Sequence, residues 1–121
     1  MRQSTLPALT LRHLTSVVAC AVYAFLFAIH ASYATLHGGG VATLVDVLGT
    51  LALLAKDHKR AGVSLEINIS FVAAANAGEE LEATGTVLKS GRSIGFTSVE
   101  IRRKADGKLI ASGRHTKMLP P

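Results

Sequence analysis

Apolar and polar residues alternate most regularly in the middle of the chain. Between residues 63 and 71 every second residue is apolar, namely Val63, Leu65, Ile67, Ile69 and Phe71. A period of two is typical of a β-strand with one buried face. Similar alternation predicts further strands over 80–89, 93–102 and 109–118, and Asp106-Gly107 is a hairpin turn signal between the last two. The second half of the chain therefore predicts four antiparallel strands.

A stretch with no such alternation precedes these strands. Between Val41 and Ala55 the only ionisable side chain is Asp46, and the other residues are mostly Val, Leu and Ala. Length and composition predict a helix over 41–56, which ends in a charged segment closing on Gly62. Because apolar residues lie on all its sides, we expect the helix to be buried, with the sheet wrapped around it. One long helix followed by four antiparallel strands is an α+β fold.

The first 34 residues form a different kind of segment. Residues 14–36 are apolar with a single titratable side chain, His30, and they reach the lower length limit of a membrane span. Four interpretations stay open: a secretory signal cleaved after Ser32-Tyr33-Ala34, a mitochondrial presequence, a membrane anchor, or an apolar helix that packs on the domain. Because the run is continuous and not alternating, we expect a separable, mostly helical segment over 1–34 and not a strand, followed by one domain over 35–121.

Composition narrows the classes of partner. The chain has 121 residues, a formal net charge of +5 and one cysteine, Cys20, which excludes an internal disulfide and fits a reducing compartment. Its six aromatic residues do not interleave with the basic residues, so nucleic-acid binding is not expected. Because no Cys and His residues have metal-ligand spacing and no nucleotide fingerprint occurs, neither a metal nor a separate cofactor is predicted.

The start of the predicted helix carries the candidate chemistry. In His37-Gly38-Gly39-Gly40 three glycines free the backbone to turn, and the first N–H groups of a helix have no intrahelical partner. Such donors suit an oxygen that gains negative charge. Asp46, about two turns further along, would be costly to bury without a purpose. Together they point to hydrolysis; the alternative is a structural Asp46 bonded to Thr43 or Thr50.

These residues resemble a known family from about Thr35 to Met118. The sequence His-Gly-Gly with an Asp nine residues after the His, the four strand patterns, and the ending Gly113-Arg114-His115-Thr116-Lys117 are similar to the hotdog-fold acyl-CoA thioesterases. The resemblance implies an antiparallel sheet wrapped around one long central helix, here with an atypical apolar N-terminal segment. It also implies an enzyme that hydrolyses fatty or aryl acyl-CoA to the free acid and CoA, so that coenzyme A is part of the substrate. It further implies a role in lipid metabolism, a homodimer that assembles into a homotetramer, and a mitochondrial or cytoplasmic location, with membrane contact through 14–36 left open.

The resemblance also assigns roles to residues. Asp46 would be the general base or nucleophile, the Gly38 N–H the oxyanion donor, and His37 an orienting group. Ser64 would hold substrate or water; it does not look like a nucleophile, because no G-x-S-x-G elbow is present. Basic side chains that would bind the CoA phosphates are Lys89, Arg92, Arg114, His115 and Lys117.

Two departures from the family pattern lie in the N-terminal segment. The family has an asparagine six residues before the His, where this chain has Ala31, and it has a strand where this chain has the apolar run. An altered start of the coding sequence would explain both. The alternative function is therefore a catalytically impaired hotdog protein that binds acyl-CoA or a partner.

Overall fold

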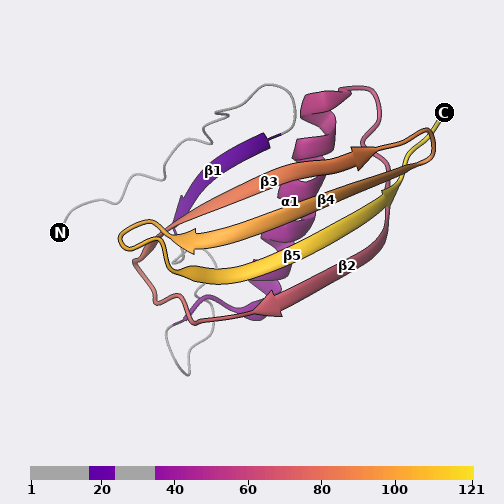
Figure 1. Cartoon of the computed structure of the whole chain (residues 1–121). Helices are drawn as coiled ribbons and strands as arrows, with labels where there is room; N and C mark the ends of the chain where they lie inside the picture. The colour runs from indigo at the N-terminus through magenta and orange to yellow at the C-terminus, as the bar shows by residue number, and fades with distance from the viewer. Residues whose placement is uncertain (1–16, 24–34) are drawn as a thin grey trace.

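The computed structural model describes residues 17–23 and 35–121. These residues form one helix and five strands (Figure 1). The elements in chain order are β1 (Val17–Tyr23), α1 (Gly38–Lys56), β2 (Val63–Phe71), β3 (Glu80–Ser90), β4 (Ile94–Arg103) and β5 (Leu109–Met118). The four strands predicted from alternation are confirmed as β2 to β5, and the predicted helix is confirmed as α1, which begins three residues earlier, at Gly38.

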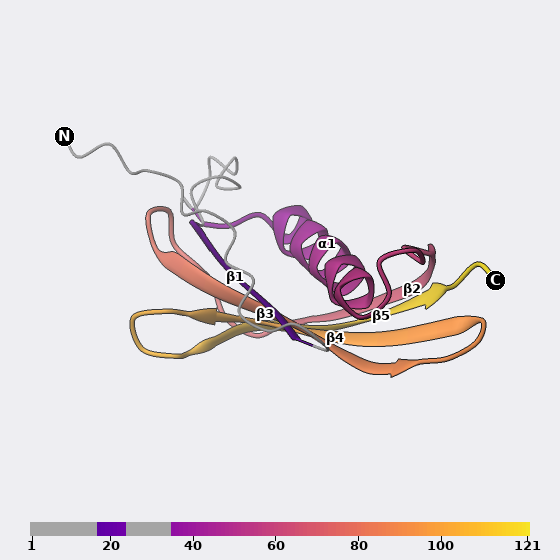
Figure 2. The same ribbon diagram turned by 90° about the horizontal axis from the view of Figure 1, so that it is seen from above.

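The five strands make one antiparallel sheet in the order β1-β3-β4-β5-β2. The helix α1 lies across one face of this sheet, and no other described element covers the opposite face (Figure 2). We call these the inner and the outer face. Side chains alternate between the two faces along each strand, so the burial of β4 and β5 also alternates.

The core lies between α1 and the inner face. Leu44, Val45, Leu48 and Ala52 of α1 are buried against side chains of the central strands. The strand residues of this core are Leu81, Ala83, Val99, Ile101, Ile110 and Ala111. Gly85 lets the helix approach β3 closely, because a Cβ at this position would lie 2.7 Å from the Leu48 carbonyl oxygen. By length and composition alone α1 is apolar enough to cross a membrane, but here its buried face is the centre of the core.

The expectation that α1 is buried on all sides is wrong for the single chain. Its buried residues form one face, while Val47 on the other side is 47% exposed and the Asp46 side chain is 52% exposed. The sheet covers one side of the helix and does not close around it. An apolar residue such as Val47 on the open side marks a surface that can still be covered by another molecule.

The expectation of a helix and no strand in the N-terminal segment is wrong for residues 17–23. These residues form β1, which pairs with β3 from Val17 opposite Thr86 to Tyr23 opposite Glu80. A short apolar run cannot be assigned to helix or strand by periodicity alone, and the valines favour a strand. Pairing also satisfies backbone groups of β3 that would otherwise form a free edge. The proposed cleavage site at 32–34 and Ala31 lie outside the described residues, and the domain boundary at 34 stays a prediction.

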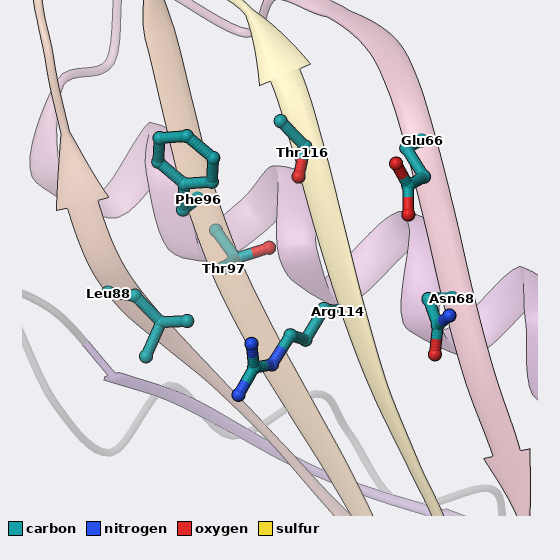
Figure 3. Close-up of a pocket in the computed structure, with 7 residues that line it drawn as sticks. All are labelled: Glu66, Asn68, Leu88, Phe96, Thr97, Arg114 and Thr116. Carbon is teal, nitrogen blue, oxygen red and sulfur yellow. The ribbon is translucent and has the colours of Figure 1, made fainter.

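The outer face of the sheet carries a depression of about 420 Å³. Its lining side chains come from neighbouring strands and lie on the side of the sheet away from α1 (Figure 3). They include Glu66 and Asn68 of β2, Phe96 of β4, and Arg114 and Thr116 of β5. This depression mixes charged, amide and apolar groups and is separated from α1 by the thickness of the sheet.

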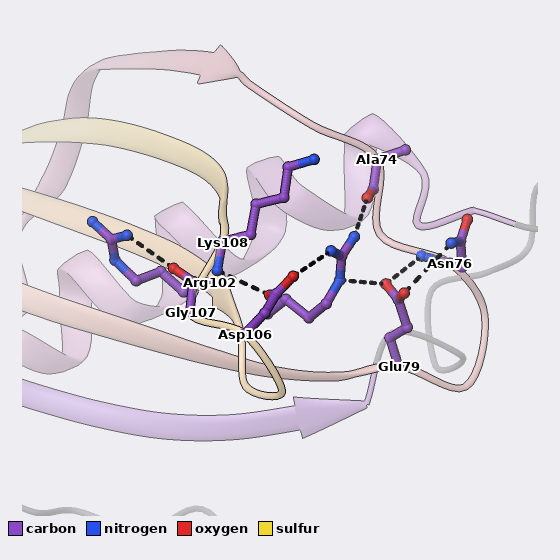
Figure 4. A network of polar contacts seen from close by, with 8 residues as sticks. Ala74, Asn76, Glu79, Arg102, Asp106, Gly107 and Lys108 are labelled. Carbon is purple, nitrogen blue, oxygen red and sulfur yellow. Dashed lines mark hydrogen bonds and ion pairs between the residues drawn. The ribbon is translucent and has the colours of Figure 1, made fainter.

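An ion-pair network at one end of the sheet supports the start of α1 (Figure 4). Arg103 of β4 lies 3.2 Å from Glu79 and 3.1 Å from Asp106, and Glu79 accepts a hydrogen bond from the Asn76 N–H at 2.9 Å. Asn76 in turn pairs with Thr35, and the Leu36 N–H donates to the Ala75 carbonyl at 2.8 Å. The segment that leads into α1 is therefore tied to the loop before β3.

Candidate functional site

His37 caps the N-terminus of α1. Its Nδ1 accepts the Gly39 N–H at 2.9 Å, and its carbonyl oxygen accepts the Gly40 and Val41 N–H groups at 2.8 and 3.1 Å. These bonds use donors that the first turn of a helix cannot satisfy internally. The N–H of Gly38 donates no hydrogen bond to another residue within 35–121. Gly38 is also exposed, so its N–H is a donor that a bound oxygen can reach.

An apolar depression of about 360 Å³ lies beside this donor. Gly38, Val41, Phe71 and Ile110 are among the residues that line it. The Phe71 ring comes so near to Gly38 that a Cβ on this glycine would lie 3.5 Å from it. The start of α1 therefore combines a polar donor with apolar walls.

Three side chains from three elements meet at the middle of α1. The side chains of Asp46 on α1 and Ser64 on β2 both approach the same atom of β5, the His115 Nε2. The Ser64 Oγ lies 2.7 Å from it and the Asp46 Oδ1 lies 3.7 Å from it. The expectation that Asp46 is buried is therefore wrong. Its carboxylate is half exposed and lies next to His115, whose side chain is fully buried.

This group is not a nucleophilic serine triad. In such a triad the serine and the carboxylate bind opposite nitrogens of the imidazole, so that the ring takes the serine proton at one nitrogen while the carboxylate orients it at the other. Here both approach Nε2, and Nδ1 is buried without a hydrogen-bond partner among the described residues. The Ser64–His115 pair therefore orients a hydroxyl group and does not activate it as a nucleophile.

The position of His115 follows from two neighbouring residues. A Cβ on Gly49 would lie 2.8 Å from the His115 Nδ1, so only glycine leaves room for this ring beneath α1. Thr97 of β4 donates from Oγ1 to the His115 carbonyl oxygen at 3.0 Å. Burial lowers the pKa of His115; the Asp46 charge opposes this shift and the Lys117 charge adds to it. The ring is accordingly neutral at neutral pH.

Lys117 is a second buried ionisable group at this site. It is 4% exposed, and its Nζ donates to the Thr50 Oγ1 at 2.7 Å. Burial lowers the pKa of Lys117, and the Asp46 charge opposes this shift. A structural Asp46 bonded to Thr43 or Thr50 is not found. Thr43 donates to the Gly39 carbonyl oxygen and Thr50 donates to the Asp46 carbonyl oxygen, so neither hydroxyl donates to the Asp46 carboxylate.

The five basic residues predicted to bind phosphate do not form one site. His115 and Lys117 lie on the inner face of β5 beneath α1, whereas Arg114 is exposed on the outer face (Figure 3). Lys89 at the end of β3 and Arg92 in the following turn are exposed. The alternation of β5 in the sequence contained this signal, because residues 115 and 117 of a strand share a face and residue 114 takes the other. The roles that Gly49, Thr50 and Thr97 have around His115 and Lys117 were missed, because they arise only from contacts between elements.

Comparison with known proteins defines the class of this chain. A family model described as the thioesterase superfamily matches residues 33–110. The chain therefore belongs to the thioesterase superfamily, and its fold is the hotdog fold of that superfamily. This confirms both the resemblance drawn from the His-Gly-Gly sequence and the predicted fold class.

Particular relatives are similar over most of the chain. Human acyl-coenzyme A thioesterase 13 is 52% identical over 85 residues, which are 70% of this chain and 61% of the relative. The crystal structure of zebrafish thioesterase superfamily member 2 has 41% identity and a TM-score of 0.85, covering 91% of this chain and 79% of that one. The crystal structure of mouse thioesterase superfamily member 2 has 38% identity and a TM-score of 0.82, covering 92% of this chain and 87% of that one. The chain thus spans about three fifths of the length of the human relative.

Proposed function

We propose that this protein is an acyl-CoA thioesterase, which hydrolyses the thioester of a fatty or aryl acyl group to the free acid and CoA. The relatives named acyl-coenzyme A thioesterase 13 support the reaction class. The observation that carries the proposal is the contact of Asp46 with the Ser64–His115 pair, because it sets a half-exposed carboxylate beside an oriented hydroxyl group. A carboxylate and a fixed hydrogen-bonding partner are what a water molecule needs to be held and deprotonated.

The reaction needs few groups. A water oxygen attacks the thioester carbonyl carbon while Asp46 accepts its proton, and Ser64 orients the water. The carbonyl oxygen gains negative charge and is stabilised by the Gly38 N–H and the positive end of α1. Collapse of this intermediate reforms the carbonyl and expels the CoA thiolate. In the alternative route Asp46 itself attacks and water hydrolyses the resulting anhydride.

A single chain does not complete this site. Gly38 and Asp46 are eight residues apart on one helix, which is about 12 Å along its axis. A catalytic base and an oxyanion donor must both lie about 3 Å from the reacting atoms. We therefore propose a homodimer in which Asp46 of one chain works with the Gly38 N–H of the other, and a homotetramer of two such dimers.

The open side of α1 and the edge strand β2 support this assembly. Val47 on α1 and Ile67 and Phe71 on β2 are exposed apolar side chains, and β2 is an edge strand. Burying such an edge and its apolar side chains is the usual gain of a permanent dimer.

The substrate would be divided between two kinds of surface. The apolar depression beside Gly38 supports an apolar acyl group close to the oxyanion donor. Exposed Lys89, Arg92 and Arg114 remain candidates for the CoA phosphates. His115 and Lys117 are buried beside Asp46, and we propose that they act on the site itself instead.

The first test is thioester hydrolysis by Asp46→Asn, followed with a thiol-reactive dye. The amide keeps the shape of the carboxylate but cannot accept a proton, so turnover should fall about a hundredfold or more while acyl-CoA still binds. Glu100→Gln is the matched control, because Glu100 is an exposed carboxylate on the outer face that pairs with Arg102. Near-full turnover in Asp46→Asn would mean that Asp46 is not the base.

The impaired binding protein is the second candidate. The residue that favours it is Ala31, which stands where the family has an asparagine. This candidate predicts that the natural sequence binds acyl-CoA and hydrolyses it as slowly as Asp46→Asn does. The same assay therefore decides between the two.

A further inference from the structure

Lys117 has an environment that a lysine seldom occupies. Lysine is among the residues that are almost never fully buried, because its ammonium loses water without a compensating partner. Lys117 is buried, and no carboxylate of the described residues lies within 4 Å of its Nζ. The short bond to the Thr50 hydroxyl is the contact that holds the ammonium in place.

The ammonium is connected to Asp46 through α1. Thr50 lies one turn after Asp46, and its hydroxyl donates to the Asp46 carbonyl oxygen at 2.9 Å while it accepts from Lys117. Lys117 and His115 are two residues apart on β5 and share the inner face. The ammonium, the imidazole and the Asp46 carboxylate are therefore neighbours beneath one segment of the helix.

Nearby charges act on the two basic members of this group. The positive charge of Lys117 disfavours a second positive charge on His115, and the negative charge of Asp46 favours the charged forms of His115 and Lys117. The ring of His115 faces Asp46 from α1, Ser64 from β2 and Lys117 on β5, and its carbonyl meets Thr97 of β4. Lys117 is the only cation among these groups.

We propose that Lys117 is a positioning residue of the site: its buried ammonium, held by Thr50 beneath α1, keeps the neighbouring His115 ring neutral. A neutral His115 can accept a hydrogen bond from the Ser64 hydroxyl at Nε2, which leaves the lone pairs of the Ser64 oxygen free to accept a hydrogen bond from water. Asp46 can then take a proton from that water. The part of this inference that concerns turnover rests on the proposed function, whereas the part that concerns charge does not.

The test uses Lys117→Met, which keeps an apolar stem and removes the charge. Titration of the His115 ring is followed by NMR on full-length protein with labelled histidine, and kcat and KM are measured across pH. Without the nearby cation the pKa of His115 should rise, and the acid limb of kcat/KM should move to higher pH by about one unit. At pH values on that limb, a shift of one unit lowers kcat/KM about tenfold. The decrease should appear in kcat and not in KM, because Lys117 does not reach the substrate.

Two further variants make the test decisive. Lys108→Met removes an exposed lysine in the β4–β5 turn region and should leave both the titration and the pH profile unchanged. Thr50→Val removes the hydroxyl that holds Nζ at almost constant volume, and it should shift the His115 titration in the same direction by a smaller amount. It replaces Lys117→Met as the test if that variant does not fold.

The outcomes separate the two proposals. An unchanged His115 titration in a folded Lys117→Met variant overturns the role of Lys117, whatever the hydrolysis rates are. A shifted titration with a matching shift of the acid limb supports it. A natural protein that titrates as expected but hydrolyses no acyl-CoA supports the control of charge by Lys117 and overturns the proposed function alone.

Discussion

At the scale of the residue, Gly49 lies on the face of α1 that meets β4 and β5. A Cβ at this position would lie 2.7 Å from the Thr97 Oγ1 and 2.8 Å from the His115 Nδ1. Neither atom belongs to a flexible chain end, because Thr97 is bonded to the His115 carbonyl and the His115 ring is buried. The absence of one methyl group therefore determines where the imidazole beside Asp46 can lie.

Gly49→Ala should destabilise the fold although alanine favours a helix. Overpacking costs about 1–3 kcal/mol, whereas the gain in helix propensity is at most about 1 kcal/mol. Thermal unfolding should therefore show a lower Tm, and the Ser64–His115 contact should be disturbed. Gly38→Ala on the same helix is the matched control for stability, because its Cβ would meet the Phe71 ring at an ordinary 3.5 Å. An unchanged or raised Tm for Gly49→Ala would show that the ring has room to move.

At the scale of the element, β1 closes one edge of the sheet and β2 leaves the other edge open. The β1 strand covers the backbone of β3 over seven residue pairs. On the open side, β2 is exposed along almost its whole length, including apolar residues of both faces. The two edges therefore differ: one is covered within the chain, and the other is available to a second chain.

Hydrogen exchange should distinguish the β1 strand from the helix that the apolar run predicts. In an edge strand only every second N–H points to its neighbour, so the amides of 17–23 should be protected alternately. A helix would protect consecutive amides, because each N–H bonds within the helix. The central strand β4 serves as the internal control, since it has a neighbour on both sides and should be protected throughout. Uniform protection of 17–23, or none, would contradict the pairing of β1 with β3.

At the scale of the whole molecule, one chain leaves its candidate site incomplete. The proposed oxyanion donor at Gly38 and the carboxylate of Asp46 belong to the same helix, about 12 Å apart along its axis, and cannot meet at one carbonyl group. Exposed apolar side chains on β2 and on the open side of α1 are available for contact with a second chain. Assembly and activity should therefore be lost together.

Ile67→Glu should convert the dimer to monomers and abolish turnover. Ile67 lies opposite His115 on the inner face of β2, and a carboxylate there would be buried without a partner in the dimer. Light scattering at micromolar concentration and the thiol-release assay measure the two effects. Leu88→Glu introduces the same charge at an exposed residue that lines the outer-face depression, so it should leave the dimer intact. If the natural protein is a monomer at this concentration, the two-chain site has no basis.

Local features of the sequence determined much of this fold. The period of two in β2, the turn residues between the later strands and the uninterrupted apolar stretch of α1 depend on neighbouring residues alone, so they could be predicted. The sequence placed the start of the helix three residues late, at Val41, and the cap that His37 forms on Gly39 was not predicted. The isolation of Asp46 among apolar residues made it a candidate, and the resemblance to the hotdog-fold thioesterases favoured a role as base over a structural one.

The tertiary structure decided the features that depend on contacts between segments far apart in the sequence. Residues 17–23 are a strand because β3 offers an unpaired edge, which no pattern within the run reveals. Asp46 is half exposed because the sheet covers one side of α1 only. His115 and Lys117 lie beside Asp46, and Arg114 lies on the far face, because strand order and register bring β5 beneath the middle of the helix. Burial and electrostatic environment arise from these contacts between distant segments, and for that reason the sequence could name the residues of the site but not their arrangement.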